Sequence, residues 1–241
     1  MPQGIQNRLM EKVTSLSFFF PAYNEEAHVE RLVRNAQRLL PEVAQSWEII
    51  PVNDGSLDGT QAIVERLAKD DPDHVRPVHH ETNRGYGSAV ISGLENSRYD
   101  LIFFTDGDNQ FDLGELPLLI EKTGVADLII GFRKNRKDPL PRKLFGYLWG
   151  SLVTMLFGFK AKDVNCAFKL IKHPVIDKIK FTSNGAVIST ELLAKAHKLG
   201  FRVAEVGVTH YPRTAGKQTG AQWKVIARAF KELFALYGEI H

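Results

Sequence analysis

Carboxylate side chains follow apolar runs of strand length at two places in this 241-residue chain. Asp54 lies in the segment Asn-Asp-Gly-Ser, and Asp106 and Asp108 form an Asp-x-Asp pair in another segment. Carboxylates suit Mg²⁺ or Mn²⁺, which usually keep waters and bind one or two carboxylates together with substrate phosphates. A lone Asp-Gly pair more often marks a tight turn. Three aspartates at the ends of two strands therefore indicate a metal-dependent phosphate site.

A glycine-rich turn, Asn-Arg-Gly-Tyr-Gly at residues 83–87, precedes an expected helix. Backbone N–H groups at a helix start attract anions, which makes Gly85 a candidate contact for a donor phosphate. The alternative is a turn that needs glycine only for a positive φ. The chain has neither a P-loop nor a G-x-G-x-x-G segment. P-loop NTPases and Rossmann dehydrogenases are therefore disfavoured.

The elements that would position these residues alternate between strand-length apolar runs and amphipathic segments. This alternation predicts an α/β fold with a mostly parallel central sheet flanked by helices, and Asn24 is expected to cap the first helix. Ligands should then bind at the carboxyl ends of the strands. The expected strands are Leu16–Phe20, Trp47–Val52, Val75–His79, Leu101–Thr105 and Leu128–Ile130, and the expected helices are Glu25–Leu40, Gly59–Lys69, Ser88–Glu95 and Leu113–Lys122.

The regular alternation ends after Gly131, where a basic loop from Arg133 to Lys143 leads into the uncharged stretch Leu144–Phe159. That stretch is shorter than the roughly 20 residues a spanning helix needs. It is expected to be either a buried helix or a helix lying on a membrane surface with its basic flanks near lipid phosphates. The later elements expected are a helix at Val187–Leu199, a strand at Arg202–His210 and a helix at Gln222–Tyr237.

Composition fits one ordinary globular domain, with 44% hydrophobic and 24% charged residues. A net charge of +3 does not predict a nucleic-acid partner. The single cysteine, Cys166, excludes an intrachain disulfide and favours a reducing compartment, and we expect it to be buried. Residues 1–14 are polar and lack the pattern of a signal peptide. A cytoplasmic location is therefore expected.

Four motifs in order resemble the family 2 inverting glycosyltransferases with a GT-A fold, and within them most closely the dolichyl- or polyprenyl-phosphate mannose and glucose synthases. The resemblance extends over about Leu16 to Lys217. It implies a single GT-A domain, with residues 14–131 binding nucleotide-sugar and metal and residues 132–241 binding the acceptor. The motifs are Pro21-Ala-Tyr-Asn-Glu25, Asn53-Asp-Gly-Ser56 with Asp58-Gly-Thr60, Asn83-Arg-Gly-Tyr-Gly87 and Asp106-Gly-Asp-Asn-Gln110.

The resemblance also implies roles for particular residues. Pro21, Tyr23 and Glu25, together with Asp54, would hold the nucleobase and ribose of a nucleotide-sugar. Asp106 would lie near the ribose and the metal, while Asp108 and Gln110 would be ligands of a Mg²⁺ or Mn²⁺ ion. The family's usual Asp-Ala-Asp-Leu-Gln reads Asp-Gly-Asp-Asn-Gln here, which preserves all three candidate ligand positions.

Basic residues of the second half match phosphate-binding positions of the family. Arg133 would pair with the donor diphosphate, for which the planar guanidinium is suited. Arg213 and Lys217 would meet the diphosphate or the lipid phosphate. Glu191 matches a recurrent family glutamate, and Asp163 a family aspartate. The expected catalytic set is Asp108, Arg133, Glu191 and Arg213.

These features predict the transfer of a hexose from GDP-mannose or UDP-glucose to a polyprenyl phosphate. That acceptor is already anionic, so no general base is required. A hydroxyl acceptor on a polysaccharide, glycolipid or small molecule is the nearest alternative, and Glu191 would then be the base. Glu191 could instead organise the acceptor site or only pair with a neighbouring lysine. A non-catalytic nucleotide-sugar-binding protein is a further alternative, whereas a nucleotidyltransferase is disfavoured because no early basic glycine-rich loop is present.

The prenyl tail of such an acceptor stays in the bilayer, which gives the stretch Leu144–Phe159 a reason to meet a membrane. Each lysine or arginine near the surface would add about 1 kcal/mol of attraction to anionic lipid. The sequence stops at His241 without the C-terminal membrane helices of many relatives. The expectation is either a peripheral enzyme on the inner face of the membrane or a missing natural tail.

Overall fold

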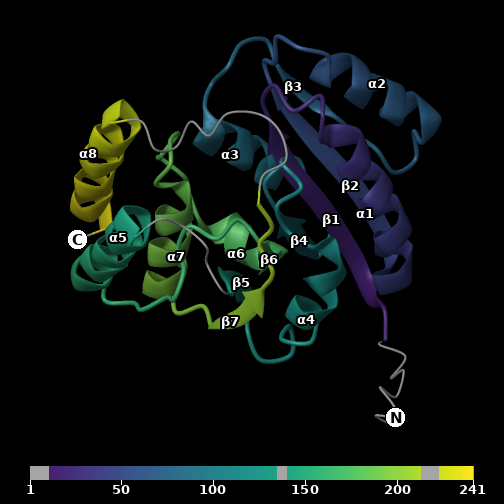
Figure 1. Ribbon diagram of the computed structural model, residues 1–241. Coiled ribbons are helices and arrows are strands. Elements are labelled where there is room, and N and C mark those ends of the chain that lie inside the picture. The colour runs from purple at the N-terminus through teal and green to yellow at the C-terminus, as the bar shows by residue number, and fades with distance from the viewer. Residues whose placement is uncertain (1–10, 135–139, 213–222, 241) are drawn as a thin grey trace, which may run out of the picture.

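A seven-stranded sheet forms the centre of the protein (Figure 1). The structure is a computed structural model that describes residues 11–134, 140–212 and 223–240. The strand order is β3-β2-β1-β4-β6-β5-β7. The strands are β1 (Val13–Ala22), β2 (Ala44–Asp54), β3 (Val78–His80), β4 (Leu101–Phe104), β5 (Leu128–Arg133), β6 (Lys169–Lys172) and β7 (Val203–Val208).

The sheet is mostly parallel, as the sequence predicts, and the α/β fold class is confirmed. β6 is the exception, because it runs antiparallel to both β4 and β5. The sequence-based prediction lacked β6, a four-residue segment too short to show a hydrophobic period. Its direction has a consequence for the site. The first residue of β6, Lys169, pairs with Phe104 at the carboxyl end of β4.

Helices flank the sheet, and their bounds differ from the predicted ones mainly at the ends. The helix expected from Glu25 begins at Val29, so the prediction that Asn24 caps it is wrong. Asn24 has a φ of +55° and its side chain binds another loop instead. The helices are α1 (Val29–Val43), α2 (Thr60–Asp70), α3 (Tyr86–Asn96), the 3₁₀ turn η1 (Leu113–Glu115), α4 (Leu116–Ile120), α5 (Leu140–Phe157), α6 (His173–Lys178), α7 (Ile188–Lys198) and α8 (Trp223–Ile240).

Stacked phenylalanines fix the centre of the sheet. Phe18 stacks on Phe103 with 5.2 Å between ring centroids, and Phe19 stacks on Phe104 at 5.1 Å. All four side chains are buried, because the central strands β1 and β4 are covered on both faces. Cys166 is also fully buried, as predicted, and burial raises the pKa of its thiol to about 12. The stacked phenylalanines therefore hold the carboxyl ends of β1 and β4 in fixed register.

Three helices of the second half, α5, α7 and α8, gather at one side of the molecule, away from α1 and α2 (Figure 1). α5 and α8 lie against each other through Trp149 with Phe230 and Phe157 with Tyr237. α5 contains most of the uncharged stretch for which a helix was predicted. The sheet itself continues across the predicted boundary at residue 131, since β5 spans it and pairs with β7.

Candidate functional site

One edge of the sheet collects the polar residues singled out from the sequence. The parallel strands β1, β2, β3, β4, β5 and β7 all end at this edge, and the antiparallel strand β6 begins there. The segments after these strands therefore meet in space although they are far apart in the sequence. The residues placed along the edge are Tyr23, Glu25, Asp54, His80, Asp106, Arg133, Lys169 and Tyr211.

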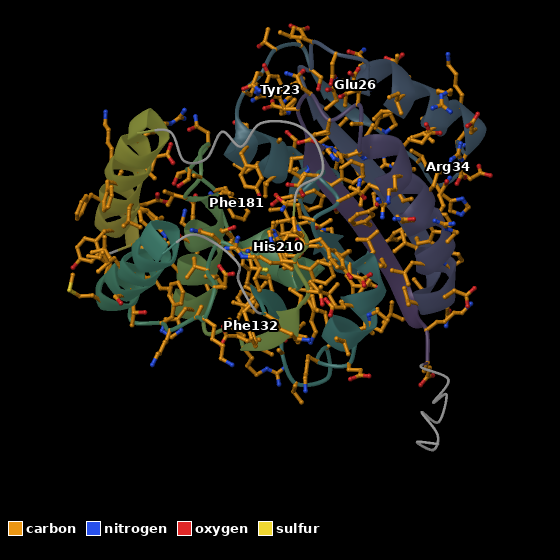
Figure 2. All side chains as sticks on the ribbon, in the orientation of Figure 1. Tyr23, Glu26, Arg34, Phe132, Phe181 and His210 are labelled. Carbon is orange, nitrogen blue, oxygen red and sulfur yellow. The ribbon has the colours of Figure 1, made fainter. Side chains whose placement is uncertain are left out.

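The loop after β1 is cross-linked to the loop after β2. The backbone N–H of Asn24 donates to Ser56 Oγ at 3.0 Å, and Asn24 Oδ1 accepts from the N–H of Leu57 at 2.8 Å. Tyr23, the residue before Asn24, is 42% exposed. Figure 2 shows Tyr23 and Glu26 at the end of the molecule where α1 begins. The loop thus offers an aromatic ring on a fixed backbone, which suits stacking with a flat ligand.

The other two predicted residues of this loop have different surroundings. Glu25 is partly buried, its carboxylate lies 2.8 Å from His28 Nδ1, and its backbone N–H donates to Thr60 Oγ1. Pro21 is buried, and its carbonyl oxygen lies where a Cβ at residue 107 would be only 2.6 Å away. This close approach leaves no room for a Cβ at Gly107.

Asp54 anchors the glycine-rich turn from beneath. Its carboxylate is 2% exposed and accepts hydrogen bonds from the backbone N–H groups of Arg84 and Gly85, both at 2.9 Å. Gly85 has a φ of +96°, a conformation that favours glycine. Asp54 was predicted to contact the nucleotide-sugar directly. The geometry gives its carboxylate a defined task in holding the turn that opens α3.

Asp106 follows β4 at this edge, and the neighbouring groups shift its pKa. Burial, and then the negative charge of Asp108, raise the pKa of Asp106 to about 6. The hydroxyl of Tyr86, which donates to Asp106 Oδ1 at 3.0 Å, opposes this rise, as do the cations of Lys169 and Arg133. Two adjacent carboxylates that repel each other make a region of negative potential, and a divalent cation would relieve it.

The segment after Asp106 is held in one conformation by its own hydrogen bonds. Asp108 Oδ1 accepts from the backbone N–H of Gln110 at 3.1 Å, and Asn109 has a φ of +57°. The side-chain nitrogen of Gln110 donates to the carbonyl of Tyr211 at 2.7 Å. Gln110 is therefore oriented with its amide oxygen as the remaining acceptor group of the side chain.

The donor set of Asp106, Asp108 and Gln110 fits Mg²⁺ or Mn²⁺. It supplies carboxylate and amide oxygens, the ligand types that these hard cations prefer. In the described part of the chain, no group of three His, Cys, Asp or Glu side chains could hold a metal alone. A site with two carboxylates suits an ion that also binds waters and a diphosphate.

Arg133 and Asp163 form a two-pronged ion pair at the end of β5. Arg133 Nε donates to Asp163 Oδ2 at 2.7 Å, and Nη2 donates to Oδ1 at 2.9 Å. Both side chains are largely buried, with exposures of 14% and 7%. Asp163 therefore holds Arg133, the predicted partner of the donor diphosphate, in a fixed orientation. From the sequence, Asp163 was known only as a match to a family aspartate. An arginine positioned in this way needs little reordering to meet a phosphate.

Lys169 lies behind this pair as a fully buried cation. Its ammonium group donates to the carbonyl oxygens of Val164 and Cys166 and to Ser189 Oγ. Burial lowers the pKa of Lys169, although the nearby Cys166, Asp163 and Asp106 oppose this. The buried cation thus links the chain before β6 to the start of α7. Its charge also favours the ionised form of Asp106.

Glu191 is fully buried, and its carboxylate oxygens already have several donors. It accepts from the backbone N–H groups of Thr182 and Ser183 at 2.7 and 2.8 Å and from Lys195 Nζ at 2.6 Å. Burial raises the pKa of Glu191, but the bonds from Lys195, Ser183 and Thr182 outweigh it and the pKa lies below its ordinary value. Of the roles left open by the sequence, pairing with a neighbouring lysine matches this environment. The carboxylate also organises the loop before α7 through Thr182 and Ser183.

The helix pair α5 and α8 has both a buried and an exposed apolar side. Trp149 and Val153 of α5 are buried, whereas Met155 is 74% exposed, and Phe234 of α8 is 57% exposed. Neither α5 nor any other helix in the described ranges has the length and apolarity required to traverse a bilayer. Arg213 and Lys217 lie outside the described residues, as do residues 135–139 of the basic loop.

Three residues at the edge were not assigned a functional role from the sequence. Tyr86 binds Asp106, Lys169 lies behind the acidic pair, and His80 binds Asp54. Tyr86 could have been found from its place inside the glycine-rich motif. The other two carried no signal, since a lysine beside a short strand and one of two adjacent histidines have no distinctive pattern.

Comparison with known proteins identifies what this arrangement is similar to. Residues 17–179 match glycosyl transferase family 2. The chain is 29% identical over 214 residues to a dodecaprenyl-phosphate galacturonate synthase of Rhizobium johnstonii, covering 83% of this chain and 60% of the relative. It is 27% identical over 217 residues to an undecaprenyl-phosphate 4-deoxy-4-formamido-L-arabinose transferase of Proteus mirabilis, covering 90% and 66%. The chain therefore spans less than two thirds of the length of these relatives.

The fold is also similar to that of solved structures. Glucosyl-3-phosphoglycerate synthase from Mycobacterium tuberculosis, in complex with Mn²⁺, UDP-glucose and phosphoglyceric acid, superposes with a TM-score of 0.74 at 19% identity. The superposition covers 93% of this chain and 80% of that one. At this identity the similarity concerns the fold alone. It agrees with the single α/β domain and mostly parallel sheet described above.

Proposed function

The chain belongs to glycosyl transferase family 2, and we propose that it transfers a sugar from a nucleoside diphosphate sugar to a polyprenyl phosphate at a membrane surface. The observation that carries the proposal is the placement of Asp106, Asp108 and Arg133 at one sheet edge, since Asp106 and Asp108 follow β4, Arg133 ends β5, and both strands end at that edge. Acidic groups for a metal and a fixed arginine for phosphates are what a diphosphate donor requires. The two curated relatives, whose names specify prenyl-phosphate acceptors, support the acceptor class.

The donor would lie across the carboxyl ends of β1, β2 and β4. Tyr23 would stack on the nucleobase from its exposed position, and Glu25 would lie beside it. Asp106 would face the ribose and the metal. The turn at residues 83–87, held by Asp54, would close the site from the side of α3. Each of these roles is a proposal supported by the placement of the residue along the edge.

Asp106, Asp108 and Gln110 would hold the metal ion, and Arg133 would pair with the donor diphosphate. A bound Mg²⁺ or Mn²⁺ supplies electrostatic stabilisation of the departing diphosphate. Arg133 would contribute its remaining N–H donors where negative charge grows, because Asp163 binds Nε and Nη2 and keeps the guanidinium in place. Arg213 and Lys217 remain predicted contacts of the diphosphate or lipid phosphate.

The transfer forms a bond between the anomeric carbon and an oxygen of the lipid phosphate, and it breaks the bond from that carbon to the diphosphate. The acceptor oxygen carries negative charge before it attacks, so no side chain has to remove a proton. The environment of Glu191 supports this mechanism, because its carboxylate is buried and bound to Thr182, Ser183 and Lys195. Glu191 is proposed to organise the loop before α7 rather than to act as a base.

The exposed apolar side of the α5–α8 pair would lie on the membrane. Leu148 and Met155 lie on one face of α5, and Phe234 and Tyr237 lie on one face of α8, because residues seven or three apart share a helix face. All four are between 38% and 74% exposed. Burial of these side chains among lipid tails would bring the sheet edge to the lipid phosphate. A peripheral position at the cytoplasmic face is part of this proposal.

The sugar is proposed to be a hexose, with GDP-mannose and UDP-glucose as the predicted donors. UDP-galacturonic acid belongs in the same test, because one relative is a galacturonate synthase. The experiment incubates the protein with each radiolabelled donor, Mn²⁺ and vesicles containing undecaprenyl phosphate, and it measures label in the lipid fraction. We expect one donor to label the lipid and EDTA to abolish the transfer. A parallel reaction offers phosphoglyceric acid in place of the vesicles, and labelling of that compound with none in lipid would reject the proposed acceptor.

A further inference from the structure

A buried histidine connects two elements beneath the glycine-rich turn. His80 is the last residue of β3 and pairs in register with Asp54 of β2. Its side chain is 4% exposed, and both ring nitrogens have partners. Nδ1 lies 2.6 Å from Asp54 Oδ1, and Nε2 lies 2.9 Å from the hydroxyl of Ser92 in α3. The ring therefore bridges the sheet and the helix that the turn opens.

We propose that His80 is a positioning residue of the donor site, which orients the carboxylate of Asp54 so that Asp54 can hold the turn at residues 83–87. This inference rests on the proposed function, since it assigns a role within the donor site. His80 itself does not touch the donor in this proposal. It acts through Asp54 and the backbone of the turn.

The hydrogen bonds of Asp54 show how the effect would be transmitted. Oδ1 accepts from His80 and from the N–H of Arg84, and Oδ2 accepts from the N–H of Gly85. A carboxylate with two backbone donors on different oxygens binds them only in a narrow range of orientations. The imidazole fixes that orientation with a strong charge-assisted bond.

The turn depends on this anchor because the N-cap residue of α3 is Gly85, which has no side chain to cap the helix. The acceptor that binds the N–H groups of Arg84 and Gly85 at this helix end is the carboxylate of Asp54. Tyr86 also donates to Asp106, so a change in the turn would reach the proposed metal site. The other side of the turn is tightly packed, since a Cβ at Gly87 would lie 2.5 Å from the carbonyl carbon of Asn184.

The order Ser92, His80 and Asp54 is that of a hydrolase relay, but nucleophilic catalysis is not supported. Ser92 lies in the interior of the helix Tyr86–Asn96. Backbone N–H groups in a helix interior are bound within the helix, so none is free beside the hydroxyl to stabilise an oxyanion. The hydrogen-bonded chain of Ser92, His80 and Asp54 therefore serves to position the turn at residues 83–87.

Two amide variants separate the two bonds of the imidazole. In His80→Asn the side-chain nitrogen lies near the position of Nδ1 and can still donate to Asp54. In His80→Gln it lies nearer to Nε2 and reaches towards Ser92 instead. His79→Asn is the matched control, because His79 is the neighbouring residue of β3, its side chain is exposed, and an asparagine amide near the position of Nδ1 can keep its hydrogen bond with Asn53.

The test measures hydrogen exchange at the amides of Arg84 and Gly85, the unfolding temperature, and the Kd for UDP and for GDP in the presence of Mn²⁺. We expect His80→Gln to exchange these two amides about ten-fold faster and to bind the nucleotide about ten-fold more weakly. His80→Asn should keep the exchange rates and the nucleotide Kd near those of the wild type, and His79→Asn should leave both unchanged. Once a donor is known, His80→Gln should raise its KM more than it lowers kcat.

Several outcomes would overturn the proposal. If folded His80→Gln keeps wild-type exchange at both amides, His80 does not hold the turn. If exchange is faster but the nucleotide affinity is unchanged, the turn is not part of the donor site. If both His80 variants fail to fold, Ser92→Ala and Asp54→Asn test the same series of hydrogen bonds from its two ends. Wild-type nucleotide affinity in Asp54→Asn would reject the proposal. If the wild-type protein binds neither UDP nor GDP, the proposed function fails and the donor role of His80 with it, whereas the exchange data still decide whether His80 anchors the turn.

Discussion

The donor edge and the α5–α8 pair solve different physical problems. At the donor edge, carboxylates such as Asp54 and Asp108 accept hydrogen bonds from backbone N–H groups of nearby turns. In the α5–α8 pair, aromatic contacts such as that of Trp149 with Phe230 hold the helices, and apolar side chains remain exposed. Directional bonds fix atoms for chemistry, whereas non-directional apolar surface suits a fluid partner. The comparison predicts that substitutions in the two regions will have separable effects.

The largest expected effect follows a change at the metal site. Asp108→Asn should lower kcat/KM on the order of 10²- to 10³-fold, because a ligand and a negative charge are lost beside the diphosphate. The unfolding temperature should stay within a few degrees of wild type. Asp112→Asn is the control, since Asp112 caps the 3₁₀ turn η1 in the same segment and asparagine can also cap. Full activity of Asp108→Asn in the presence of a chelator would contradict the metal assignment.

The next effect concerns stability in the second half. Glu191→Gln should lower the free energy of unfolding by about 2–3 kcal/mol, because an amide nitrogen would face the N–H donors that now bind the carboxylate. The lowered pKa of Glu191 gives the sign for the wild type: its stabilisation is present above the ordinary pKa of 4.5 and is lost as pH falls below it.

Denaturant unfolding at pH 7 and at pH 4 measures both statements about Glu191. The kcat of the folded Glu191→Gln protein should remain within a few-fold of wild type. A hundred-fold loss of kcat with unchanged stability would instead show that Glu191 acts in the chemistry. Glu239→Gln provides the comparison, because Glu239 also pairs with Lys195 but is more exposed.

A smaller effect is expected in the pH dependence of metal binding. With the pKa of Asp106 near 6, Mn²⁺ affinity should fall as pH drops below about 6, because protons compete for the carboxylate. The raised pKa also means that the metal-free protein loses stability as pH rises from about 4 to about 6. Tyr86→Phe removes a bond that favours the ionised form, so the loss of affinity should move to higher pH. Calorimetric titration across this range checks the shift, and an unmoved midpoint would contradict it.

The smallest effect should appear on the membrane side. Met155→Glu and Phe234→Glu should each weaken binding to anionic vesicles by about 1 kcal/mol, roughly five-fold, while nucleotide affinity stays unchanged. Val125→Glu is the matched control, because Val125 is 64% exposed and lies in the segment after α4. Sedimentation with vesicles measures the binding. An equal loss with Val125→Glu would show that only net charge matters.

The same contrast explains how much the sequence could predict. The sites of Asp54, Asp106 and Asp108 were predicted because each follows an apolar run, and parallel strands end at one edge. The helix within Leu144–Phe159 was predicted from its composition. Both predictions depend on short segments of the chain. In the structure Asp54 ends β2, Asp106 and Asp108 follow β4, and α5 contains most of the uncharged stretch.

Features that depend on distant partners were not predicted. The bond between Arg133 and Asp163 joins residues 30 positions apart, and that between His80 and Asp54 joins residues 26 apart. Asn24 was assigned to a helix cap, but its partner is Leu57 in another loop. The antiparallel strand β6 is another example, because four residues carry no period and the pairing with β4 is tertiary.

The most direct test of the proposed function compares two acceptors that differ by one phosphate. With the active donor and Mn²⁺ supplied, undecaprenyl phosphate and undecaprenol are offered in identical vesicles, and the glycolipid product is quantified by mass spectrometry. We expect a sugar-phosphate-lipid product from undecaprenyl phosphate and none from undecaprenol, because the proposed mechanism uses no side chain as a base for a hydroxyl acceptor. Transfer to undecaprenol at a similar rate would contradict it.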